Sequence, residues 1–291
     1  HKYEAVVPAP ELNKQGYTTH TCKVCGDSYV DSYTGALKGE ASIGNVGYES
    51  LEKAIAAAQP GDVIVLNENV EASAIITIDK AITINGNGKT LTSTAGRAIN
   101  VSGANGVTIK NLTINASGER AINIIQNATN VTIENVTATA ANYTVNVAAS
   151  APDANVTISN STLTGLNTVN IAGANAVVTI NDSTIICNDQ NESENYYAIA
   201  VNKDATNAVV TVNGGEIIVN GGSYAGSVSS DDASLVLNGT ETHGATIRVV
   251  NFAIVYGNNY YSFSTLAEAI EVVKAGETIE LAPWQFYLLA K

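Results

Sequence analysis

Four side chains near the N-terminus have the chemistry of a metal site. They are two imidazoles and two thiols, namely His1, His20, Cys22 and Cys25. Thiolates and imidazoles are ligands that zinc prefers, and four of them complete a tetrahedral shell. The Cys-x-x-Cys pair is also compatible with a disulfide or with free thiols. The sequence therefore makes zinc a candidate cofactor of residues 1–40 and leaves the state of the cysteines open.

A second group of candidate side chains surrounds a long polar insertion. It combines tyrosine rings, which suit sugars, with carboxylates, which suit Ca²⁺. The group consists of Tyr196, Tyr197, Tyr224, Asp189, Glu192 and Glu194. Tyr197 and Tyr224 are 27 residues apart, and long loops on rigid scaffolds often carry function. We expect a glycan or Ca²⁺ site here, with a solvated loop tip as the alternative.

The element that must position these groups is a repeated strand motif. A β-branched tripeptide with Thr at its centre occurs at residues 82–84, 107–109, 131–133, 156–158, 178–180 and 210–212. The motifs start 25, 24, 25, 22 and 32 residues apart, and such a period is typical of a solenoid. Alternation turns the aliphatic residues inward and the Thr outward. The predicted fold is all-β: a right-handed, single-stranded parallel β-helix with short helical caps and a small N-terminal module.

Each repeat also contains two further strands and a sharp bend after the first. The residues at this bend are Asn111, Asn135, Asn160 and Asp182, with Gly86 and Gly214 in the outer copies. Asn and Gly tolerate the left-handed backbone that a sharp bend requires. We also expect stacked Asn side chains to hydrogen-bond from one coil to the next.

The helical caps divide the chain into three parts, at residues 1–40, 41–256 and 257–291. In the second part, Ser50 precedes a short helix whose apolar stripe comprises Leu51, Ala54, Ile55 and Ala58. The same stripe returns 215 residues later at Leu266, Ala269, Ile270 and Val273. There Thr265 and Glu268 form a capping-box pair. The third part is therefore either a C-terminal cap or the start of a second β-helix cassette.

Composition excludes some partners. The chain has 291 residues, a net charge of −13 and a pI of about 4.5, which argues against nucleic acid because phosphate binding needs a basic face. No apolar run has the length of a membrane span. The chain starts at His1 and contains no Met, which suggests a mature portion or a fragment. We expect a monomer.

Two resemblances extend this interpretation. A cap helix followed by strand coils resembles the N-terminal end of the pectate-lyase-like superfamily of right-handed parallel β-helices. Residues 16–29 resemble a zinc-ribbon-like repeat of secreted and wall-attached proteins of gut bacteria. Where that repeat has another Cys and a closing Gly-His, this chain has Leu12 and residues 38–40, so two expected ligands are absent. The resemblances imply a bacterial protein that is extracellular or at the cell surface.

The resemblance to pectin-active proteins also raises the question of catalysis. Lyases of this kind use carboxylate-bound Ca²⁺ and a basic residue, and related hydrolases use paired carboxylates. Asp231, Asp232, His243 and Arg248 have these residue types, but their spacing puts them on different coils, and the Asn-Thr-Asp motif of the family is missing. We therefore assign no catalytic residue.

The expected function is that of a non-catalytic, modular surface or secreted protein. Its β-helix would act as an adhesive, glycan-binding wall or as a rigid spacer, and its partner would be a glycan or a host or surface protein. The alternative is a polysaccharide lyase or glycoside hydrolase that acts on uronic-acid polymers.

Overall fold

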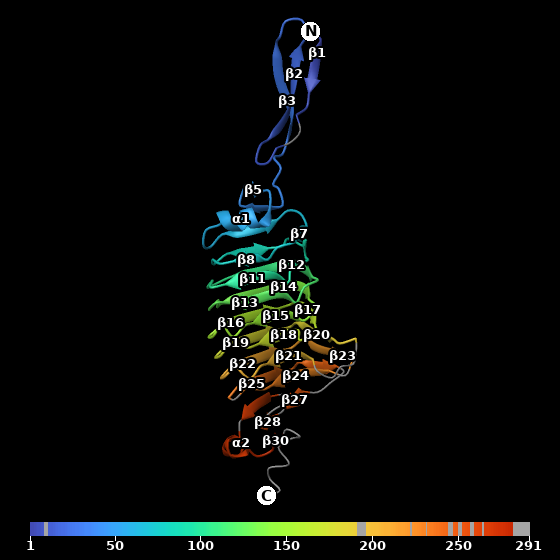
Figure 1. Ribbon diagram of the computed structural model, residues 1–291. Coiled ribbons are helices and arrows are strands. Elements are labelled where there is room, and N and C mark those ends of the chain that lie inside the picture. Colours follow the sequence, from blue (N-terminus) through green and yellow to red (C-terminus); the bar gives the residue numbers. More distant parts are fainter. Residues whose placement is uncertain are drawn as a thin grey trace.

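The repeated β-branched motifs form stacked parallel strands in the computed structural model, a β-solenoid of about seven turns (Figure 1). The structure describes residues 1–8, 11–190, 196–221, 223–230, 232–243, 247–249, 252–256, 259–263 and 265–281. The predicted all-β parallel solenoid with two short helices is confirmed.

Each turn supplies one strand to each of three faces. The first face contains β6 (Val63–Leu66), β9 (Thr83–Asn85), the first part of β12 (Thr108–Ala116) and of β14 (Val131–Thr139), β16 (Asn155–Ser159), β19 (Val177–Asn181), β22 (Val209–Asn213) and β25 (Ser234–Asn238). The second contains β7 (Val70–Ala72), β10 (Thr90–Ser93), the later parts of β12 and β14, β17 (Thr162–Gly165), β20 (Thr184–Asn188), β23 (Glu216–Asn220) and β26 (Glu241–His243). The third contains β8 (Ile76–Ile78), β11 (Arg97–Ser102), β13 (Arg120–Ile125), β15 (Tyr143–Val147), β18 (Val169–Ile171), β21 (Tyr197–Val201), β24 (Tyr224–Val228) and β27 (Ile247–Val249).

The core is a set of aliphatic columns that run along the solenoid. Ile84, Ile109 and Ile133 are register partners on successive turns, and each is at most 1% exposed. Their Thr neighbours are partly exposed. The predicted alternation is therefore confirmed, and full burial of each aliphatic side chain contributes about 2–3 kcal/mol.

The bend between the first and second faces has the predicted left-handed backbone at five positions. These are Asn111 (φ 52°), Asn135 (φ 51°), Asn160 (φ 50°), Asp182 (φ 46°) and Gly214 (φ 66°). The prediction is wrong for Gly86, because the positive φ angles of that turn belong to Asn87 and Gly88. Gly86 is instead a point of close approach, since a Cβ there would lie 2.5 Å from the Asn111 carbonyl oxygen and 2.6 Å from Leu112 Cβ.

The predicted amide stacking is present, and it reaches beyond the bend. On the third face the side chain of each Asn donates to the Asn one turn before it, over 2.7–2.9 Å. This amide ladder consists of Asn100, Asn123, Asn146, Asn170 and Asn202. Its three central members are only 1–5% exposed, so the ladder satisfies amides that would be costly to bury unpaired.

The N-terminal cap consists of β4 (Ala41–Ile43), β5 (Val46–Tyr48) and α1 (Leu51–Ala57). The Ser50 side chain accepts a hydrogen bond from the Lys53 amide, as predicted. The apolar stripe of α1 is at most 6% exposed, so this helix covers the open end of the first turn (Figure 1).

At the opposite end lie β28 (Phe252–Tyr256), β29 (Asn259–Phe263), α2 (Leu266–Val272) and β30 (Thr278–Glu280). Both hydrogen bonds of the capping box between Thr265 and Glu268 form. β28 pairs with both β29 and β30, so these three strands form one antiparallel sheet at this end.

The N-terminal module is an antiparallel sheet of β1 (Tyr3–Val6), β2 (Gly16–Cys22) and β3 (Ser28–Thr34). It lies at the pole of the solenoid next to β5 (Figure 1). Asn13 joins the two bodies: its Nδ2 donates to the Gly47 carbonyl over 2.8 Å, and its Oδ1 accepts from the Gly47 amide over 2.5 Å. Neither described helix has the length or apolar character needed to cross a membrane.

The contact at Gly86 predicts a contrast between two glycines. Gly86→Ala should lower the free energy of unfolding by about 1–3 kcal/mol, because the new methyl group overpacks the contact between coils. Gly96→Ala is the matched control, since nothing lies within 4 Å of its Cβ position and its φ is not positive. Urea unfolding measures both, and equal midpoints would contradict the close approach.

Candidate functional site

The N-terminal module brings three of the four predicted metal ligands together. His1 Nδ1 lies 3.2 Å from Cys25 Sγ and 3.5 Å from Cys22 Sγ, and the donor atoms of these three residues all lie within 4.8 Å of one another. The pairing of β1 with β2 sets Tyr3 opposite Cys22, which places His1 beside the turn that carries Cys25. We call these three residues the thiol–imidazole cluster.

His20 does not join the thiol–imidazole cluster. It lies two residues before Cys22 on the same strand, a step of about 7 Å. Its Nε2 is 2.9 Å from Asp31 Oδ1, and its ring stacks on Tyr29 with centroids 4.6 Å apart. The hydrogen bond from His20 lowers the pKa of Asp31 below its ordinary value.

The electrostatics of the cluster favour a thiolate. Hydrogen bonds from the backbone amides of Cys25 and Val24 lower the pKa of Cys22 to about 7. Two sulfurs and an imidazole are a zinc-type donor set, and nitrogen and sulfur ligands of one tetrahedral zinc lie about 3.5 Å apart. All described cysteines are free thiols. The three residues therefore fit Zn²⁺ and leave a fourth position for another ligand.

The predicted tyrosine and carboxylate patch is divided by the fold. Tyr197 and Tyr224 are register partners on β21 and β24, and their rings stack with centroids 5.8 Å apart. Tyr196 instead packs against the core. Asp189 is 1% exposed and accepts a hydrogen bond from Ser223 over 2.8 Å.

The remaining two members of that patch, Glu192 and Glu194, lie outside the described residues. The sequence placed Asp189 on the surface because it begins a polar insertion. Its partner Ser223 is far away in the chain, so no local signal identified the buried contact. Of the described members, only the two stacked tyrosines form a shared surface feature.

Sequence reasoning missed a column that continues the stacked tyrosines along the third face. Arg97, Arg120 and Tyr143 are successive register partners, and the Arg120 guanidinium lies 5.3 Å from the centre of the Tyr143 ring. Asn167 follows, and its Oδ1 accepts from the Tyr197 amide over 3.2 Å. The constant spacing of 23 residues between Arg97, Arg120 and Tyr143 is the signal that could have revealed it. We call this set, with Tyr197 and Tyr224, the arginine–tyrosine column.

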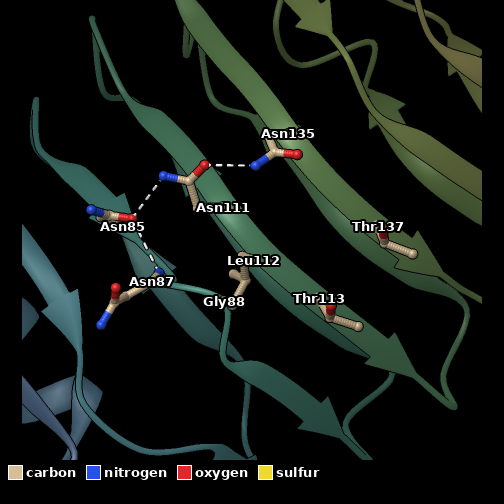
Figure 2. A pocket seen from close by; sticks show the side chains of 8 residues that line it. All are labelled: Asn85, Asn87, Gly88, Asn111, Leu112, Thr113, Asn135 and Thr137. Atoms are coloured by element: carbon tan, nitrogen blue, oxygen red, sulfur yellow. Dashed lines mark hydrogen bonds between the residues drawn. The ribbon is translucent and has the colours of Figure 1, made fainter.

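A shallow groove lies at the bend between the first and second faces. Its volume is about 390 Å³. Figure 2 shows the amides of Asn85, Asn111 and Asn135 bonded in a row, with Thr113 and Thr137 beside them. The side chains that line the groove include no acid or base. This groove therefore offers hydrogen bonds and no proton-transfer group.

The structure gives little support to the residues that resemble a hydrolase site. Asp231 and the side chain of Arg248 lie outside the described part of the chain. His243 is 3.5 Å from Glu241, which is the register partner of Glu216 one turn earlier. All three side chains in this cluster are exposed, whereas acid–base catalysis usually relies on enclosed groups.

Comparison with protein-family models, with curated proteins and with solved structures gives no significant match.

The cluster predicts zinc binding with a defined ligand set. Cys25→Ala should weaken Zn²⁺ binding at least tenfold under reducing conditions, because it removes one of two thiolates, whereas His20→Gln should leave binding unchanged. Binding should also weaken as the pH falls below about 7, where Cys22 gains its proton. Titration with Co²⁺, followed by its thiolate charge-transfer band, measures each case. Equal affinities of the wild type and Cys25→Ala would rule the cluster out as a zinc site.

Proposed function

We propose that this chain is a non-catalytic module of a bacterial surface or secreted protein, and that its β-helix serves as a rigid spacer. The observation that supports this most is the continuity of one hydrogen-bonded sheet from β4, beside the N-terminal module, to β30 at the far end. Each turn is bonded to the next through the backbone and through amide ladders. Bending such a stack requires that bonds between adjacent turns break.

The arrangement of the parts suits a spacer. The N-terminal module and α2 lie at opposite poles (Figure 1). About seven turns, at about 4.8 Å per turn, separate them by roughly 34 Å. The resemblances to pectate-lyase-like β-helices and to the zinc-ribbon-like repeat of wall-attached proteins support a place outside the bacterial cell.

A stiff spacer predicts one fixed distance between labels on the same face. Val63 and Val209 are 43% and 39% exposed, and six strand pairings separate β6 from β22. Spin labels at Val63→Cys and Val209→Cys, in a background with Cys22→Ser and Cys25→Ser, should give a single narrow distance of about 30 Å. Pulsed electron spin resonance measures it. A broad or bimodal distribution would contradict the spacer.

A second candidate function is glycan binding on the third face. The arginine–tyrosine column presents guanidinium groups and tyrosine rings along several turns. Guanidinium groups bind carboxylates by paired hydrogen bonds, and tyrosine hydroxyl groups donate and accept hydrogen bonds with sugar hydroxyls. The column therefore suits an acidic polysaccharide that lies along the rod.

The glycan proposal predicts a face-specific loss of binding. On an array that includes uronic-acid polymers, Arg120→Gln and Tyr197→Ala should each reduce the signal at least tenfold. Lys110→Ala on the first face is the control and should have no effect. The same polymers, incubated with the protein, should yield no new reducing ends and no unsaturated products. Product formation that Asp232→Ala abolishes would favour the enzyme alternative, and unchanged array signals would exclude the column.

A further inference from the structure

The two ends of the solenoid repeat one small fold. In the first unit β4 pairs antiparallel with both β5 and β6, and in the second β28 pairs antiparallel with both β29 and β30. Ile43 is the register partner of Val46 and Ile64, and Ile254 is the register partner of Tyr261 and Ile279. The offset of 215 residues relates β29, α2 and β30 to β5, α1 and β6, whereas Ile254 follows Ile43 by 211 residues because the chain between Ile254 and Tyr261 is longer than that between Ile43 and Val46.

The equivalent helices differ in what covers them. Ile55 on α1 is 6% exposed, whereas its equivalent on α2, Ile270, is 57% exposed. The described residues of the α2 helix include one buried side chain, that of Ala269. Within the stripe of α2, Ala269 is buried and Leu266 and Val273 are partly buried, so Ile270 is the position at which the two helices differ most.

The cover over α1 comes from the turn that follows it. The Lys80 ammonium donates to the carbonyls of Ile55 and Ala58 at the C-terminal end of the helix, each over 3.1 Å. The edge of β6 that does not pair with β4 pairs with β9, with Val63 opposite Thr83. Within the described part of the chain, β30 pairs with β28 alone, so its equivalent edge has no such strand.

The β29 side of the second unit is already paired with the last turn of the solenoid. β29 pairs antiparallel with β25, the first-face strand of the last turn, with Ser234 opposite Tyr261. The sheet of the solenoid thus continues through β29 and β28 to β30. A strand added at β30 would extend that sheet without a break.

We propose that residues 252–281 are a junction, and that the exposed Ile270 of α2 and the edge of β30 that no described strand occupies receive the first turn of a second parallel β-helix. We expect the first turn of this second β-helix to resemble the turn that follows α1. One of its strands would pair with β30 as β9 pairs with β6, and a cationic side chain would bind the C-terminal carbonyls of α2 as Lys80 binds those of α1. The inference deepens the proposed spacer function, which it takes as its premise, because it gives the rod a means of extension.

The test uses an extended protein in which a second copy of the solenoid turns follows the C-terminal unit. Leu281 is the equivalent of Leu66, so residues 67–256 are placed after Leu281 in the register that they have after Leu66. Amides of α2 and β30 should then exchange with solvent at least tenfold more slowly than in the 291-residue chain. Small-angle scattering should show a single straight rod. A shorter extension, with residues 67–147, tests the same contact with fewer turns.

Matched substitutions identify the contact. Ile270→Asp should leave the unfolding midpoint of the 291-residue chain unchanged. In the extended chain the same substitution should restore fast exchange of the backbone amide hydrogens of α2. Ile55→Asp should destabilise both proteins, because that side chain is buried. The junction would be overturned if the amide hydrogens of α2 exchanged equally fast in the extended chain. It would also be overturned if scattering showed two bodies joined flexibly, or if dimers of the 291-residue chain slowed the same exchange. If the amide hydrogens of α2 exchange slowly in the extended chain but the spin labels at positions 63 and 209 give a broad distance distribution, the junction is supported and the spacer function is contradicted.

Discussion

The fold depends on register: each residue must lie directly over its equivalent one turn earlier. The parallel pairings keep this alignment from β9 to β22, with Ile84, Ile109 and Ile133 in one column. Side chains of the same type therefore contact one another on successive turns. Aliphatic columns fill the interior, and the amide ladder pairs a donor with an acceptor at each of its steps. A slip of one residue would reverse both faces of a strand at once.

Register also decides which groups are available for chemistry. Tyr197 stacks on Tyr224 because the two occupy one position on successive turns, so much of each ring face is covered by its neighbour. Cys187 occupies an interior position, where burial raises the pKa of its thiol to about 11. Cys22 lies instead in the N-terminal module, where hydrogen bonds from the backbone amides of Cys25 and Val24 lower the pKa of its thiol to about 7.

The features that repeat are the ones that the sequence predicted well. The three strands per turn, the left-handed bends at Asn111 and Asn135, and both helix caps follow from local residue preferences. The misses arise from contacts between distant residues. Gly86 is small because Leu112 lies against it, and Asp189 is buried with Ser223. His20 is held by Asp31 on the neighbouring strand, which ligand spacing alone does not show.

The amide of Asn13 has a consequence for the rod as a whole. By bonding both backbone groups of Gly47, it imitates the peptide of a neighbouring strand and seals the edge of β5 against chance pairing with other chains. The equivalent strand at the far end, β29, is occupied by the solenoid itself. The two poles of the rod therefore present different strand edges to their surroundings.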